Sequence, residues 1–178
     1  MLRVIAFCTY LAAWVVFVIG AAIGAMPALR RQAATTTHIT ATTIIGALLQ
    51  IASAMVLTLS LSTGPLRPPP LHLAAVIALA PLGAALFLWS LRSAHEGLVT
   101  TGPYSLLRHP IYLAFLAMLV ATGLLVTTLP KLALAIIIYI AGTELRIAEE
   151  ERELSERHAG DFEHYRSRTR WRYLPGLR

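Results

Sequence analysis

The sequence has few charged residues for its length. Only 13% of its 178 residues are charged, whereas 57% are hydrophobic and the mean hydropathy is +0.67. Soluble domains carry about 25% charged residues, so a soluble globule of this composition would lack the polar side chains that cover such a surface. The composition therefore excludes an ordinary soluble protein and predicts an integral membrane protein.

Cysteine is almost absent as well. The single cysteine, Cys8, lies inside an apolar stretch. An intramolecular disulfide and a cysteine-based metal cluster are therefore excluded, and we expect no metal site. The redox compartment stays open.

Long apolar stretches make up most of what is present. A helix needs roughly 20 apolar residues to cross a bilayer, and five stretches meet or approach this length: residues 4–25, 39–61, 71–91, 111–127 and 129–141. The last stretch continues into residues 142–146, so its helix could leave the membrane without ending. The sequence predicts an all-α membrane protein with about five transmembrane helices, the last two forming a hairpin.

A signal peptide is disfavoured because the first stretch is too long and no convincing cleavage site precedes Arg30.

The basic residues are unevenly divided between the two sides that five spans define. Arg3, Arg67 and Lys131 fall on one side, and the other twelve Lys and Arg residues fall on the opposite side. Because basic loops face the cytoplasm, we expect a bacterial inner-membrane protein with its N-terminus outside and its C-terminus cytoplasmic. The basic residues of the tail then serve to set the orientation in the membrane and to attract anionic lipid. We therefore expect no nucleic-acid partner.

Acidic residues gather near the C-terminus. Eight of the nine lie between Glu144 and Glu163, interleaved with arginines. This pattern predicts a cytoplasmic amphipathic helix with i,i+4 ion pairs, followed by Tyr165, Trp171 and Tyr173, which are typical of the membrane interface.

The loop before the fourth span is the first segment able to carry chemistry; it reads Leu98-Val99-Thr100-Thr101-Gly102-Pro103-Tyr104-Ser105-Leu106-Leu107-Arg108-His109-Pro110-Ile111-Tyr112. Gly102-Pro103 indicates a turn, and Pro110 suits the first position of a helix, where its missing N–H costs nothing. The free amides that follow, with Arg108 nearby, would make a place for a carboxylate or phosphate.

The second such segment follows the fifth span, in the run Glu144-Leu145-Arg146-Ile147-Ala148-Glu149-Glu150-Glu151-Arg152. Arg146 and Glu150 are four residues apart and share a helix face. A charge pair that emerges from a membrane helix is costly unless it is partnered or functional.

Each segment also has a plain structural interpretation. The loop could be a helix cap at His109 that Tyr104 and Tyr112 anchor at the interface. The charged run could be a solvated helix held by pairs such as Arg146 and Glu150. The residues alone leave both interpretations open.

Together the two segments resemble one family. The pattern Leu-Val-x-x-Gly-x-Tyr-x-x-x-Arg-His-Pro-x-Tyr, a helical hairpin, Arg-x-x-x-Glu-Glu and a tail with Asp161-Phe162 and Tyr165 resemble the isoprenylcysteine carboxyl methyltransferase family and its bacterial relatives. The phospholipid N-methyltransferases are more distantly similar. The resemblance covers roughly Glu96 to Pro175. We expect one integrated domain with two parts: residues 1–92 with three transmembrane helices, and residues 93–178 with the cofactor-binding loop, the transmembrane hairpin and the catalytic tail.

The resemblance implies an S-adenosylmethionine site beneath the membrane surface. Its cofactor-binding residues would be Glu96, Gly97, Leu98, Val99, Tyr104, His109, Pro110, Ile111 and Tyr112, the first four as a strand-like contact. Glu150 would take the cofactor's amino group or a ribose hydroxyl, and Arg146 would orient the substrate.

The implied activity is methyl transfer to a lipophilic acceptor in the membrane: a prenylated protein C-terminus, a lipid or a small lipophilic acid. A carboxylate nucleophile needs no base, whereas an amine would need His109 or Glu150 as its base. Two alternatives remain: a sterol-reductase-like NADPH enzyme, which the Glu-Glu pair after Arg146 disfavours, and a non-catalytic membrane protein that binds lipid or a partner. The nucleophile and the oligomeric state stay open.

Overall fold

The structure is a computed structural model that describes residues 1–34, 40–59, 68–93, 97–174 and 176, with the backbone alone for residues 24–34. Its helices are α1 (Leu2–Ala34), α2 (Ala41–Thr58), α3 (Pro70–Ser93), the short 3₁₀ helix η1 (Gly102–Ser105), α4 (Pro110–Val126) and α5 (Leu129–Arg168). The described residues form no strand.

Three helices are long and apolar enough to cross a membrane: α1 over Leu2–Ile23, α2 and α3. The helix α4 is apolar but shorter. The prediction of an all-α integral membrane protein is confirmed. Five crossings, a cytoplasmic amphipathic C-terminal helix and the division at residue 92 stay predictions.

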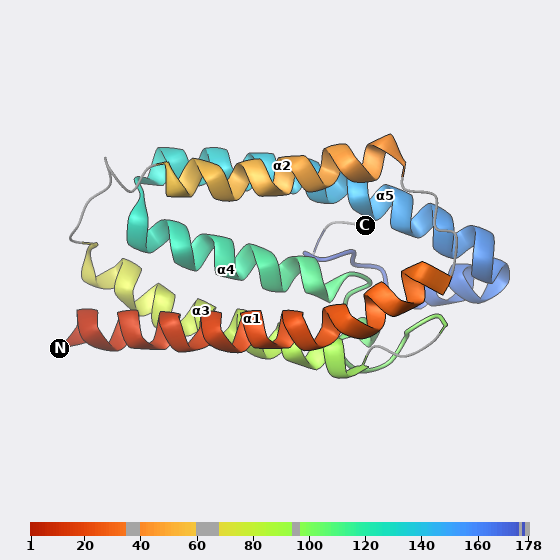
Figure 1. The fold of residues 1–178 in the computed structure, drawn as a ribbon, viewed down its shortest axis with the longest axis horizontal. Coiled ribbons are helices and arrows are strands. Elements are labelled where there is room, and N and C mark those ends of the chain that lie inside the picture. The colour runs from red at the N-terminus through yellow and green to blue at the C-terminus, as the bar shows by residue number, and fades with distance from the viewer. Residues whose placement is uncertain (35–39, 60–67, 94–96, 175, 177–178) are drawn as a thin grey trace.

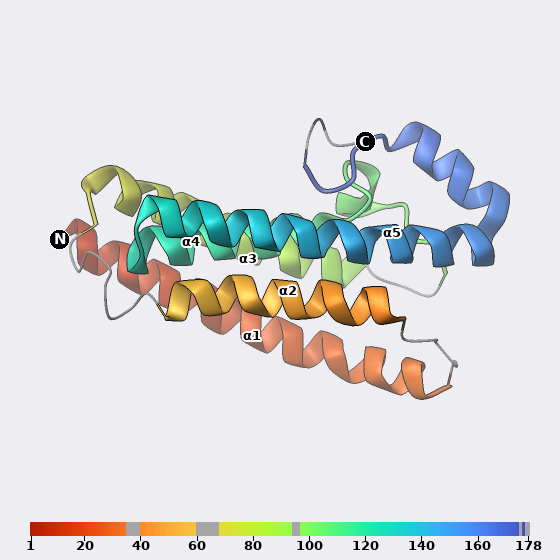
Figure 2. The ribbon, with the colours of Figure 1, turned by 90° about the horizontal axis from the view of Figure 1, so that it is seen from above.

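The helices form two layers, which Figure 2 shows from above. One layer holds α3, α4 and α5, and the other holds α1 and α2. Within the bundle, α1 packs on α3 and α2 packs on α5, with α4 between the two pairs (Figure 1). The loop before α4 and the charged half of α5 lie toward the same end of the bundle, and residues 171–172 lie beside the start of α4 (Figure 1).

The last helix continues far beyond its apolar stretch, as predicted. A single helix runs from Leu129 toward Arg168, with one break at Ala159, where φ is 30° and ψ is −110°. These angles lie outside the helical region, so the chain turns there and the end of α5 doubles back toward the bundle (Figure 2). The turn brings the residues after Arg168 beside the start of α4.

The start of α4 also agrees with the sequence. The helix begins at Pro110, with His109 in the capping position, and the Gly102-Pro103 turn forms η1. Gly102 has a positive φ of 62°, and a Cβ atom there would lie 2.3 Å from Ser93 Oγ. Glycine is therefore needed on both grounds, because the loop passes directly over the end of α3.

The helices α2 and α5 approach each other at two glycines. A Cβ atom on Gly142 would lie 2.6 Å from the carbonyl oxygen of Gly46. Backbone cannot move aside as a flexible side chain can, and small residues are what allow such close helix approach in lipid. The pair thus sets the distance between α2 and α5.

We expect Gly142→Ala to lower the free energy of unfolding by about 1 to 3 kcal/mol, because the added methyl group forces α2 and α5 apart. Thermal unfolding of the detergent-solubilised protein measures this. Gly160→Ala is the matched control, since nothing lies within 4 Å of a Cβ atom at Gly160. Equal losses in the two variants would contradict the close crossing.

Candidate functional site

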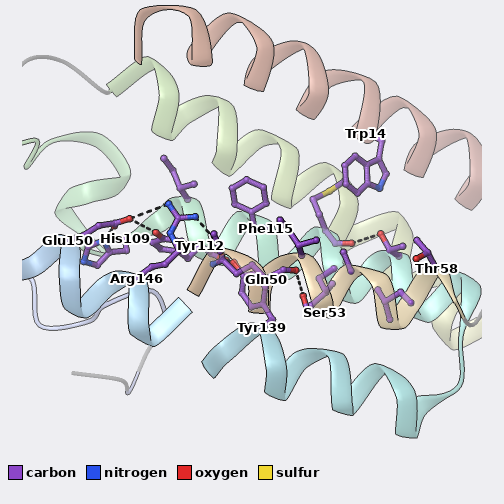
Figure 3. A pocket seen from close by; sticks show the side chains of 18 of the residues that line it. Trp14, Gln50, Ser53, Thr58, His109, Tyr112, Phe115, Tyr139, Arg146 and Glu150 are labelled. Carbon is purple, nitrogen blue, oxygen red and sulfur yellow. Dashed lines mark hydrogen bonds and ion pairs between the residues drawn. The ribbon is translucent and has the colours of Figure 1, made fainter. Parts of the chain in front are cut away.

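Two cavities meet at the charged end of the bundle. The larger has a volume of about 810 Å³ and lies among α1, α2, α4 and α5, with mostly apolar side chains around it. The smaller, about 290 Å³, lies between the loop before α4 and the charged half of α5. Tyr104, His109 and Glu150 line both cavities. In Figure 3, His109, Glu150 and Arg146 stand at one end of the larger cavity, and Trp14 and Thr58 at the other.

His109 lies between two carboxylates. Its Nδ1 is 3.3 Å from Glu150 Oε2, and its Nε2 is 3.3 Å from Glu151 Oε1. An ionised carboxylate only accepts hydrogen bonds, so both ring nitrogens must donate, and the ring is an imidazolium. Its side chain is 8% exposed, so this charge is buried.

The surroundings shift the pKa values of His109 and Glu151 in opposite directions. Burial by itself lowers the pKa of His109, but the hydrogen bonds and charges of Glu150 and Glu151 outweigh burial and raise the pKa above its ordinary value. For Glu151, burial by itself raises the pKa, but hydrogen bonds from His109 and Arg108 and their charges lower it to about 2. The ionised forms of His109 and Glu151 thus stabilise each other in the folded protein.

Glu150 is the carboxylate that both cavities share. Its Oε1 accepts a short hydrogen bond from the Tyr112 hydroxyl and lies 3.7 Å from Arg146 Nη2. The predicted i,i+4 pair is therefore present. The Glu150 side chain is still 40% exposed, so it can contact a further ligand.

Arg146 lines the larger cavity at its polar end. Its Nη1 donates to Gln50 Oε1 at 3.1 Å, and its guanidinium carbon lies 5.6 Å from the centroid of the Tyr112 ring. The side chain is 33% exposed. A cation held beside an aromatic ring and next to an apolar cavity is suited to an anionic head group on a lipophilic molecule.

Arg108 does not form the anion site that we expected from the sequence. Its Nε donates to Glu151 at 2.8 Å, and its Nη1 donates to the carbonyl oxygens of Thr169 and Arg170 at 2.8 and 2.9 Å. The side chain is only 2% exposed. Arg108 therefore holds the C-terminal residues against the loop, because its Nε and Nη1 donate to groups within the protein.

The C-terminal residues 169–173, here called the tail segment, complete this end of the bundle. The backbone N–H groups of Arg108 and His109 donate to the carbonyl oxygens of Trp171 and Arg172, at 2.9 and 2.8 Å. Arg172 also bridges Glu144, at 2.7 Å, and Glu151, at 3.4 Å. The tail segment is thus bound by backbone and side chain alike.

The expectation that the C-terminal aromatics lie at the membrane interface is wrong for Tyr165 and Tyr173. Both are buried, Tyr173 completely, whereas Trp171 is half exposed. Tyr173 packs with Tyr112 and Ile147, and the Tyr165 hydroxyl donates to the carbonyl oxygen of Tyr104. The turn at Ala159 is the reason, because it returns these residues to the protein.

Most of the predicted site residues gather around the two cavities. Gly97, Leu98, Val99, Tyr104, His109 and Glu150 line the smaller cavity, and Ile111, Tyr112 and Arg146 line the larger one. Residues 98–100 have no strand partner in the described part of the chain. Pro110 is buried at the start of α4, and Glu96 lies outside the described residues.

Sequence reasoning missed three residues of this site: Gln50, Tyr139 and Glu151. Glu151 carried a weak signal, since it is the second residue of the Glu-Glu pair in the motif. Tyr139 supports the site from within α5 by donating to the carbonyl oxygen of Tyr112 at 2.8 Å. Gln50 is a lone amide within an apolar span. Polar residues in membrane helices are often functional, so its position could have marked it as a candidate.

The fold and the site define a polytopic membrane protein with a large apolar cavity that ends at a buried charge cluster and a second, smaller cavity. Residues 71–156 match the model of the isoprenylcysteine carboxyl methyltransferase (ICMT) family. This segment is therefore similar to that family of methyltransferases, in agreement with the resemblance of its motifs. The match begins within α3 and ends in α5, before the tail segment. No curated protein matches the sequence.

The charges of His109 and Glu151 predict a range of pH in which the fold is most stable. Because the folded pKa of His109 is raised, its contribution is complete below 6.5 and is lost as the pH rises through the folded value. Because the pKa of Glu151 is lowered to about 2, its contribution is complete above 4.5 and is lost as the pH falls toward 2. We expect maximal thermal stability between these limits.

Thermal unfolding of the detergent-solubilised protein across pH tests this expectation. His109→Gln keeps a hydrogen-bonding side chain but cannot become charged, so its stability should no longer decline on the alkaline side. An unchanged alkaline decline in this variant would show that His109 is not the group responsible.

Proposed function

We propose that this protein transfers a methyl group from S-adenosylmethionine to the carboxylate of a lipophilic acceptor. The observation that carries the proposal is the meeting of an apolar cavity and a smaller polar cavity at Tyr104, His109 and Glu150. Such a junction suits a reaction that joins a lipophilic molecule and a water-soluble one. The family match supports the same chemistry.

The residues around the smaller cavity fit the cofactor. Glu150 and Glu153 offer carboxylates to an ammonium group or to ribose hydroxyls, and their side chains are 40% and 34% exposed. The backbone of residues 97–99 offers hydrogen-bonding groups along one wall. S-adenosylmethionine would supply a methyl group on a positively charged sulfur, which the two carboxylates would also favour.

The larger cavity fits the acceptor. The volume of about 810 Å³ lies within the range of about 300 to 1,000 Å³ typical of ligand pockets. The cavity lies between the pair α1–α3 and the pair α2–α5, so we propose that the acceptor enters sideways from the bilayer between α1 and α2. Arg146 at the polar end would orient its carboxylate next to the smaller cavity.

The ionisation of His109 favours a carboxylate over an amine as nucleophile. An amine needs a base to take its proton, but both ring nitrogens of His109 donate to carboxylates, so the ring has no free lone pair. A carboxylate attacks without losing a proton, and the protein then has to align the two reactants and exclude water. The acceptor could be a prenylated C-terminus or another lipophilic acid.

The membrane orientation belongs to the same proposal. The cofactor is water-soluble and cytosolic, so the charged end of the bundle would face the cytoplasm, as the distribution of basic residues also indicates. The N-terminus, at the opposite end in Figure 1, would then be outside.

Binding of S-adenosylmethionine to the detergent-solubilised protein, measured by calorimetry or with radiolabel, is the decisive experiment. We expect saturable binding that Glu150→Gln weakens by about tenfold or more, because the variant cannot pair with an ammonium group. Glu163→Gln is the matched control, since Glu163 is exposed and lines neither cavity.

Absence of saturable binding by the wild type would refute the proposal. Binding of NADPH without binding of S-adenosylmethionine would instead favour a reductase on a similar scaffold. Methylation of a lipid extract by the wild-type protein then identifies the acceptor.

A further inference from the structure

We infer that Gln50 is the residue that aims Arg146 at the larger cavity and thereby gives the site its preference for an anionic acceptor. Gln50 lies on α2, before the segment that matches the family, so the match assigns it no role. The inference rests on the proposed function, because it concerns recognition of the acceptor by Arg146.

The amide of Gln50 joins two residues of α5. Its Nε2 donates to Thr143 Oγ1 at 2.9 Å, and its Oε1 accepts from Arg146 Nη1 at 3.1 Å. A guanidinium group can only donate, so the amide oxygen must face Arg146 and the amide nitrogen must face Thr143. Thr143 is completely buried, which fixes the other end of the amide.

The close crossing of α2 and α5 makes this contact possible. A Cβ atom on Gly46 would lie 2.6 Å from Arg146 Cγ, so the stem of Arg146 passes directly over that glycine. Gln50 is one turn further along α2 and meets the guanidinium at the end of this stem. The position of Arg146 is therefore set by a helix other than its own.

The contact with Gln50 competes with the attraction of Arg146 to Glu150. Arg146 Nη2 is 3.7 Å from Glu150 Oε1, too far for a good hydrogen bond, whereas Nη1 is within hydrogen-bond distance of Gln50. Without the amide, the guanidinium would be free to move onto Glu150, and the two charges would neutralise each other. Gln50 thus keeps Arg146 available to an acceptor and Glu150 available to the cofactor.

The test compares how an anionic and a neutral lipophilic probe bind to variants of Gln50. Oleate and oleyl alcohol have the same chain and differ in the charged head. We expect the wild type to bind oleate more tightly than oleyl alcohol. Gln50→Leu should weaken oleate binding by about tenfold and leave the binding of oleyl alcohol unchanged. Gln50→Glu should weaken oleate binding further, because a carboxylate there would neutralise Arg146.

Two further variants separate this role from a purely structural one. Leu48→Ala, on the exposed side of α2, is the control and should bind both probes as the wild type does. Thr143→Val releases the other end of the amide and should weaken oleate by a few-fold even if the Gln50 variants fail to fold. Equal weakening of both probes, or no preference of the wild type for oleate, would overturn the inference.

The same samples separate this inference from the proposed function. Binding of S-adenosylmethionine should also weaken in Gln50→Leu, because Arg146 would then pair with Glu150, so the proposed function is tested on the wild type alone. If the wild type binds S-adenosylmethionine but the Gln50 variants bind oleate as tightly as the wild type does, the inference about Gln50 is wrong and the proposed function stands. If the wild type does not bind S-adenosylmethionine, the proposed function fails whatever the probes show.

Discussion

The rest of the site depends on the hydrogen bonds and ion pairs of one buried carboxylate, that of Glu151. It accepts hydrogen bonds from Arg108, His109 and Arg172, which belong to the loop before α4, the cap of α4 and the tail segment. A buried carboxylate is costly unless cations and hydrogen bonds compensate it, so removal of one partner leaves the others with unpaired charge. Glu151 therefore joins three parts of the chain that are distant in sequence.

Groups of opposite charge alternate from Glu151 toward α2. His109 lies between Glu151 and Glu150, Glu150 lies near Arg146, and Arg146 donates a hydrogen bond to Gln50. Each member has neighbours of complementary charge or polarity, so the series can extend from the tail segment to the edge of the apolar cavity without an isolated buried charge. The matched segment supplies the middle of this series, while its two ends come from α2 and the tail segment.

Adjacent positions on α5 explain how two neighbouring glutamates take different roles. Successive residues on a helix point about 100° apart. Glu150 therefore faces the cavities and stays 40% exposed, whereas Glu151 turns inward and is 8% exposed. The Glu-Glu pair of the motif is thus one carboxylate available to ligands and one that holds the surrounding structure together.

The sequence by itself determined the apolar helices, the start of α4 at Pro110 and the shared face of Arg146 and Glu150. These depend on local rules: backbone groups in lipid must bond within a helix, proline lacks an N–H, and residues four apart are neighbours. Only the tertiary structure decided that Glu151 is buried, that Gln50 meets Arg146 and that Arg108 binds the tail segment. These contacts join residues 43 to 96 positions apart, and they depend on how the helices cross and on the turn at Ala159, which no local pattern encodes.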